Sequence, residues 1–186
     1  MNVHLLKSIR QIKAENYHRP LPNPEMVDRP SLEDDSKMLF TIQYVVLIRN
    51  IADCMFPPNT VTTDAGNKVT ISASDALIER YVFFRSVWQP EWGQRIHLVL
   101  KQLTTSCIAK YGDHFSVLDE SVKTLCLADL EKENYTKTEW PYQDRQKQAF
   151  NLIQQTMTEG FFGEPGYGGN DSGLGWYYSN FLTIRE

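Results

Sequence analysis

Apolar side chains recur at steps of three and four residues through most of this chain, in segments separated by prolines and glycines. That spacing gathers them on one face of a helix, whereas a half-buried strand would alternate at every second residue. The first such segment follows a capping signal at residues 31–34 and stops before Pro57. Its stripe consists of Phe40, Tyr44, Leu47, Ile51 and Met55. Because strand alternation is nearly absent, the sequence predicts an all-α fold, an irregular bundle of about five helices.

The same periodicity predicts four more helices. They are expected between Ser72 and Pro90, between Trp92 and Gly112, after Ser116, and between Pro141 and Gly160. Their core-facing stripes are, in the same order, Leu77, Tyr81, Phe84 and Trp88; Trp92, Ile96, Val99, Leu103 and Cys107; Leu118, Val122 and Leu125; and Phe150, Ile153 and Met157. Between the first two helices, the polar stretch around Gly66 allows a short hairpin within residues 61–71.

The chain is predicted to have three parts. Prolines at positions 20, 22, 24 and 30 disfavour helix at the residue before each, so residues 17–30 should form an extended arm. We expect an N-terminal helix or arm at residues 1–36, a helical domain at 37–159, and a glycine- and aromatic-rich docking tail at 160–186.

Composition and charge exclude several classes of function. The 186 residues are 41% hydrophobic and carry a formal net charge of −4, which fits a folded domain with a buried core. No run of lysines and arginines offers a basic face for a phosphate backbone, so nucleic acid is not an expected partner. The longest apolar stretch falls short of the ~20 residues of a membrane helix, so direct membrane insertion is not expected.

The tail has the most unusual composition in the chain. It holds seven of the ten glycines, at positions 160, 163, 166, 168, 169, 173 and 175, and we expect this density to exclude a helix. Large rings alternate with these glycines, and each is worth roughly 2 kcal/mol when it is buried. Such rings are unfavourable in water, so the tail should pack either on the bundle or on another polypeptide.

This tail resembles a known family. The run from Thr156 to Asp171, followed by Gly175-Trp176, is similar to the signature of the gluconate 2-dehydrogenase subunit 3 family. The segment from Ile51 to Pro58 resembles the family's aspartate-containing stretch that runs into a proline.

The resemblance implies a non-catalytic small subunit. Members bind a large catalytic subunit of the glucose-methanol-choline type that acts on sugars, sugar acids or related alcohols, sometimes with a cytochrome c subunit. By this likeness FAD belongs to the partner, no cofactor is expected on this chain, and the small subunit stabilises the partner and assists its maturation. The implied partner-binding residues are Phe161, Phe162, Pro165, Tyr167, Gly168, Gly169, Asn170 and Trp176.

The chain departs from the family pattern at both ends. Many members begin with a twin-arginine export signal, which the first residues here lack, so we expect a cytoplasmic location, or a periplasmic one if a partner carries the chain. Many members also end in a Gly-Phe-Pro-Gly sequence, whereas Trp176 is followed here by two tyrosines. The end of the docking surface is therefore expected to differ.

A catalytic alternative remains open beside the subunit hypothesis. The chain could be a small cofactor-free enzyme with a ligand pocket between helices that the aromatic tail closes, with Asp53 or His97 as its acid or base. For Asp53 a structural hydrogen bond at the helix end is the simpler interpretation.

The four scattered histidines predict no metal site, and Cys54, Cys107 and Cys126 are expected to behave as small buried hydrophobic residues. A third possibility is a scaffold that has lost its dehydrogenase.

Overall fold

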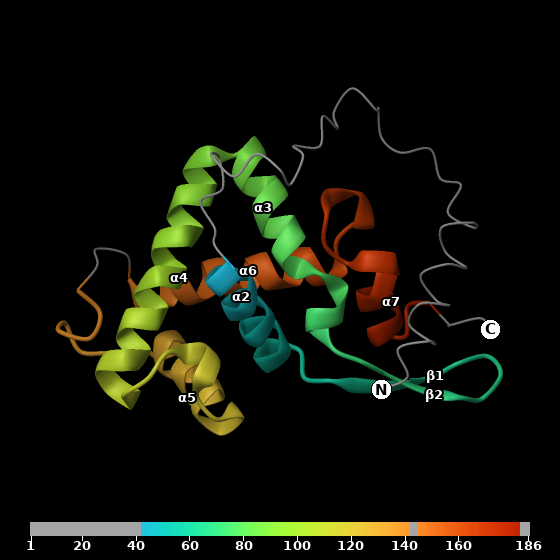
Figure 1. The fold of residues 1–186 in the computed structure, drawn as a ribbon, viewed down its shortest axis with the longest axis horizontal. Coiled ribbons are helices and arrows are strands. Elements are labelled where there is room, and N and C mark those ends of the chain that lie inside the picture. The colour runs from blue at the N-terminus through green and yellow to red at the C-terminus, as the bar shows by residue number, and fades with distance from the viewer. Residues whose placement is uncertain (1–41, 142–144, 183–186) are drawn as a thin grey trace.

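The computed structural model describes residues 42–141 and 145–182 (Figure 1). The predicted N-terminal arm and the start of the first predicted helix lie outside these residues. The α-helices described are α2 (Ile42–Met55), α3 (Ile78–Trp88), α4 (Pro90–Tyr111), α5 (Glu120–Glu131), α6 (Gln146–Phe162) and α7 (Leu174–Tyr178). Short 3-10 turns are η3 (Ala73–Ala76), η4 (Phe115–Val117), η5 (Pro165–Tyr167) and η6 (Asp171–Gly173). The predicted mostly helical class is confirmed.

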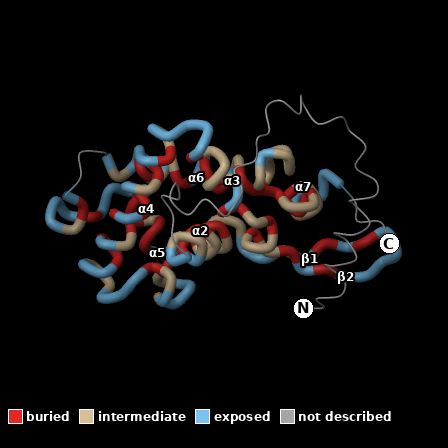
Figure 2. Tube along the Cα trace, turned by 45° about the horizontal axis from the view of Figure 1, so that its top comes forward, coloured by how far each residue is buried: buried red, intermediate tan, exposed pale blue. Residues whose placement is uncertain are grey.

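The core collects apolar side chains from all of the larger elements. Ile48 and Ile51 of α2 are fully buried, and so are Leu103 of α4 and Ile153 of α6. Figure 1 shows α6 running across the middle of the molecule, with α3 and α4 at one side and the hairpin and α7 at the other. Buried positions occur on every labelled element in Figure 2, so the elements share one hydrophobic core.

A two-stranded hairpin is the one sheet among the described residues. Strand β1 (Asn59–Thr62) pairs antiparallel with β2 (Lys68–Ile71), and Val61 lies opposite Val69. Gly66 takes a positive φ of 84° in the connecting turn, which glycine adopts without steric cost. The predicted pairing within residues 61–71 is confirmed.

The helix α4 follows its predicted pattern closely. Ile96, Val99, Leu103 and Cys107 are buried, and Gly112 ends the helix in the left-handed conformation. A strict three-and-four repeat on a long helix leaves little freedom in which face is buried.

Two predicted stripes were wrong. Helix α3 begins only at Ile78, after Leu77 adopts a left-handed φ of 54°, and its fully buried apolar residues are Ile78 and Val82 rather than the predicted aromatic stripe. Helix α5 is preceded by Asp119 rather than Ser116, and Leu125 is 49% exposed. Both helices are short and touch neighbours on more than one side, so sequence spacing alone did not select the face toward the core.

The tail contains more regular structure than predicted. Helix α6 runs through Gly160 and ends at Phe162, and α7 forms within the glycine-rich segment, so the expectation that glycine excludes a helix there was wrong. At Gly160 a Cβ atom would lie 2.7 Å from Ile78 Cγ2. The close packing of α6 on α3 therefore requires glycine here and outweighs its propensity cost of about 1 kcal/mol. The boundary predicted at residue 160 falls inside α6.

Within the described ranges, no helix combines the length and the hydrophobicity needed to cross a bilayer.

Candidate docking surface

Asn170 organises the turns of the tail. Its side chain is completely buried, donates from Nδ2 to the Gly163 carbonyl at 2.7 Å, and accepts from the Gly175 amide at 2.8 Å. Its own backbone is left-handed, with φ 49°, a conformation that asparagine tolerates better than most residues. One neutral amide thus joins the end of α6 to the start of α7.

Two glycines let the tail lie directly on the backbone of α6. A Cβ atom at Gly169 would come within 2.2 Å of the Gly160 carbonyl oxygen, and one at Gly175 within 1.9 Å of the Phe161 carbonyl oxygen. No side chain fits at either position without moving the backbone. The glycine run is therefore packed against the chain itself at these two positions.

Most rings of the tail pack inward. Phe161 is fully buried and lies 4.7 Å from the Phe162 ring and 5.0 Å from the Tyr178 ring, measured between centroids. Phe56, which follows α2, adds a ring 5.2 Å from each phenylalanine. Because Phe161 and Asn170 have no exposed surface, they support the tail from within, and their implied contact with a partner stays a prediction.

Trp176 and the residues beside it tie the end of the tail to the body. The Trp176 indole donates to the Phe162 carbonyl at 2.8 Å. The Tyr178 hydroxyl donates to the Pro57 carbonyl at 2.8 Å, and Asn59 donates to the Tyr178 carbonyl at 3.0 Å. Trp176 is only half-buried, so it can hold the tail and still offer part of its ring to another molecule.

Phe181, near the end of the described tail, is exposed. Another group of rings open to solvent is built by two elements together, and we call it the aromatic edge: Phe84 and Trp88 of α3 together with Tyr167 of η5. Trp88 is 42% exposed and Tyr167 is 47% exposed. Their rings meet edge to face at 6.1 Å, and Trp88 stacks on Phe84 at 6.4 Å. Gly168 makes this meeting possible, because a Cβ atom there would lie 2.1 Å from the Phe84 ring.

A polar cluster below the aromatic edge fixes α3 to α6. Arg85 and the Tyr81 hydroxyl both donate to the Glu159 carboxylate, and the Arg85 guanidinium lies 4.4 Å from the centroid of the Trp92 ring. Burial alone would raise the pKa of Glu159, but the donors around it outweigh that effect and leave its pKa below the ordinary value. These contacts hold α3, which carries Phe84 and Trp88 of the aromatic edge, against α6.

Asp53 has a structural partner. Its Oδ1 atom accepts a hydrogen bond from the Ser74 amide at 2.8 Å, which links the end of α2 to the turn η3. Burial raises its pKa, and the Ser74 bonds only partly offset that effect. This arrangement favours the simpler interpretation, a loop-fixing hydrogen bond.

Nothing observed favours the catalytic alternative. His97 packs on the Tyr44 ring at 4.8 Å, and burial lowers its pKa. A groove of about 480 Å³ lies between α2, α4 and η4, with Ile42, Val46 and Ile108 among its lining residues, but none of the described tail residues, up to 182, lines it. In the part of the chain that the structure describes, no group of three or more His, Cys, Asp or Glu side chains is placed to hold a metal ion.

The fold and the surface define a class of protein: a small, mostly helical body that displays an exposed aromatic edge. A family comparison then identifies it more closely. The model of gluconate 2-dehydrogenase subunit 3 matches residues 44–181, so the chain belongs to that family, whose name is that of an accessory subunit of a dehydrogenase complex. No curated protein and no solved structure gave a significant match.

Sequence reasoning found part of this surface and missed the rest. Tyr167, Pro165 and Gly168 were all implied by the family motif, and all three retain some exposed surface. Trp88 and Phe84 were expected in the core instead. A signal was present, since α3 carries six aromatic or arginine side chains among its eleven residues, too many for one buried stripe.

Proposed function

We propose that this chain is a non-catalytic subunit that binds a large FAD-dependent dehydrogenase of the glucose-methanol-choline type, acting on sugars, sugar acids or related alcohols. It stabilises that partner and assists its maturation. Two observations support the proposal. The chain belongs to the family, and the family motif contributes Tyr167 and Gly168 to the aromatic edge. FAD stays on the partner, and the residues described here position groups for contact rather than for catalysis.

The observation that carries the proposal is the solvent exposure of Trp88 and Tyr167 side by side. Tryptophan and tyrosine are the residues most often found at the energetic centres of protein interfaces, because each buries a large rigid area at little entropic cost. Here the two rings already hold each other at 6.1 Å, so little further ordering is needed on binding.

The inward-facing part of the family motif supports the same surface. Gly168 places η5 on Phe84, while Asn170 and Gly169 fix the turn that follows. Some motif residues thus pack inside the tail and stabilise its turns, whereas others are exposed on its surface. Tyr167 belongs to the displayed group, together with the accessible parts of Pro165, Phe162 and Trp176.

Co-purification tests the proposal directly. The chain carries an affinity tag and is co-expressed with a flavoprotein dehydrogenase encoded beside its gene, and we expect a yellow complex to be recovered. The double change Trp88→Ser and Tyr167→Ser should lower the recovered flavin at least tenfold.

Leu125→Ser is the matched control, because Leu125 is exposed to a similar extent, at 49%, and lies on α5 at the far end of the molecule from α7 (Figure 1). This variant should bind as the unchanged protein does. A colourless monomer from the unchanged chain, or equal flavin recovery with the double variant, would contradict the proposal.

A further inference from the structure

The groove between α2, α4 and η4 gathers aliphatic side chains that are open to solvent. Ile42 and Val46 of α2 are 74% and 44% exposed, Ile108 of α4 is 41% exposed, and Val117 of η4 is 66% exposed. Because these residues come from three elements, the fold brings them together, and they are not the face of a single helix. Single exposed apolar residues are ordinary, whereas a group of them around one hollow indicates a binding surface.

Buried side chains form the floor of this groove. Leu47 of α2 and Phe115 of η4 both line it and both belong to the hydrophobic core, and Phe115 has no exposed surface. The groove encloses about 480 Å³, which lies within the roughly 300–1,000 Å³ of small-ligand sites. Such sites are mostly apolar and hold a few polar groups that orient the ligand. The groove therefore has the size and the lining of a site for a small molecule.

The charge of the groove is positive. Lys101 of α4 lines it, and none of the described lining residues is acidic, although the whole chain has a formal net charge of −4. Lys101 is exposed, and its ammonium group makes no ion pair or hydrogen bond with the described residues. A cation beside an apolar hollow is complementary to a ligand that joins an apolar body to a negative group.

We propose that this groove binds an alkyl carboxylate, with its chain against the exposed aliphatic residues and its carboxylate beside Lys101. A single lysine matches one negative charge, whereas a phosphate group carries nearly two charges and three acceptor oxygens that call for more donors. The site is separate from the aromatic edge, because Phe84, Trp88 and Tyr167 do not line the groove. The inference therefore goes beyond the proposed subunit role.

Calorimetric titration of the full chain with hexanoate, octanoate and decanoate at neutral pH tests the site. Each added methylene group should lower the dissociation constant about two- to fourfold, because it leaves water for the groove. Decanol has the same chain as decanoate but no charge, and it should bind about two- to fivefold more weakly, the range for an exposed charge pair. Equal dissociation constants along the acid series, or equal binding of decanol and decanoate, would overturn the inference.

Two pairs of variants locate the site. Val46→Glu places a carboxylate in the groove and should weaken decanoate binding about tenfold or more, because like charges repel. Leu98→Glu is the matched control, since Leu98 is 46% exposed on α4 but does not line the groove. Lys101→Met should weaken binding about two- to fivefold, and Lys101→Arg should preserve it. If decanoate bound Val46→Glu and Leu98→Glu equally well, the groove would not be its site.

Macromolecular occupants of the groove predict different results. Saturating decanoate should neither release a co-purified flavoprotein nor change the sedimentation of the isolated chain. Release of the flavoprotein would make the groove part of the partner interface, and dissociation of a dimer would assign it to a second copy, so either result would overturn the inference. The calorimetry uses the isolated chain, and its outcome does not depend on whether the proposed subunit role is correct.

Discussion

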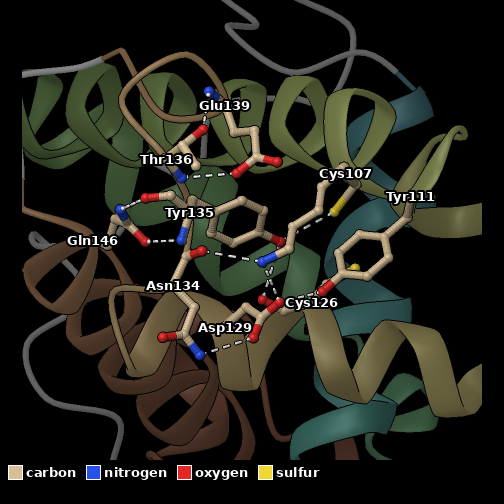
Figure 3. A network of polar contacts seen from close by, with 10 residues as sticks. Cys107, Tyr111, Cys126, Asp129, Asn134, Tyr135, Thr136, Glu139 and Gln146 are labelled. Atoms are coloured by element: carbon tan, nitrogen blue, oxygen red, sulfur yellow. Dashed lines mark hydrogen bonds and ion pairs between the residues drawn. The ribbon is translucent and has the colours of Figure 1, made fainter.

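Two irregular segments of this protein are ordered by opposite means. In the tail, residues 163–178, glycines let the backbone touch the carbonyl groups of α6, and the neutral amide of Asn170 joins the turns. In the loop, residues 132–140, charged and polar side chains converge instead. Asp129 accepts hydrogen bonds from Tyr111 and Asn134 and pairs with Lys110, and Gln146 makes two hydrogen bonds to the Tyr135 backbone (Figure 3).

This difference predicts how mutation and pH should affect the stability of each segment. A contact between backbones tolerates no added atom, but it carries no charge and should be insensitive to pH. A cluster of ionisable side chains can adjust its rotamers to small changes in volume, but it loses its ion pair when the carboxylate is protonated. Lack of regular structure therefore does not indicate lack of order in either segment, and the two can be told apart by mutation and by pH.

The largest effect is expected at Gly175. In Gly175→Ala the new Cβ atom would lie 1.9 Å from the Phe161 carbonyl oxygen, so the start of α7 must move away from α6. We expect the free energy of unfolding in urea to fall by about 3 kcal/mol or more. Gly66→Ala is the control, because nothing lies within 4 Å of the added atom and only the positive φ is penalised, at about 1 kcal/mol. Equal losses in the two variants would show that the tail is not closely packed.

Asn170 should give the next largest effect. Asn170→Ala leaves the Gly163 carbonyl and the Gly175 amide without their buried partner, and each unpaired group costs about 1–2 kcal/mol. Thermal unfolding should show a loss of about 2–3 kcal/mol, and the loss should be the same at pH 7 and at pH 4.5, because no charge is removed. A loss that varied strongly between these pH values would contradict the account of the tail.

The loop should show the reverse behaviour through Asp129. Burial alone raises the pKa of Asp129, but the hydrogen bonds from Lys110, Tyr111 and Asn134 together outweigh it and hold the pKa below its ordinary value. A carboxylate with a lowered pKa stabilises the folded protein above its unfolded-state pKa, and that contribution disappears as the pH falls through the folded-state value. We expect the free energy of unfolding to decline from about pH 5 downward.

Asp129→Asn tests the origin of that decline. It should cost about 1–3 kcal/mol at pH 7, since the amide cannot pair with Lys110, and the remaining pH dependence below pH 5 should be shallower. Urea unfolding at several pH values from 3.5 to 7, with the approximate range set by the carboxylate pKa, measures both quantities. An unchanged slope in the variant would place the acid sensitivity elsewhere.

How far the sequence predicts this molecule depends on how many neighbours each element has. Helix α4 was predicted correctly to its last residue because a strict apolar repeat and a terminal glycine both act locally. For α3 the rings were recognised but placed in the core, since nothing local showed that Trp88 would meet Tyr167, far along the chain.

The sequence predicted which tail residues make up the site, but it did not predict which of their side chains are buried and which are exposed. The tail motif indicated that its rings must be covered, but it could not show that Phe161 turns inward while Tyr167 turns outward. That choice is made by glycine contacts with distant carbonyl groups.

The smallest effect on stability is expected at Tyr167, and that small effect is informative. Its ring is 47% exposed and touches Trp88 by an edge, so Tyr167→Ser should change the free energy of unfolding by less than about 1 kcal/mol. Phe161→Ser, at the end of α6, removes a fully buried ring and should cost about 3 kcal/mol or more, as much as Gly175→Ala. Urea unfolding of the two variants would therefore separate the residues that the tail displays from those that it uses to fold. If Tyr167→Ser were as damaging as Phe161→Ser, the aromatic edge would be part of the core, and Tyr167 could not serve as a ring displayed for a partner.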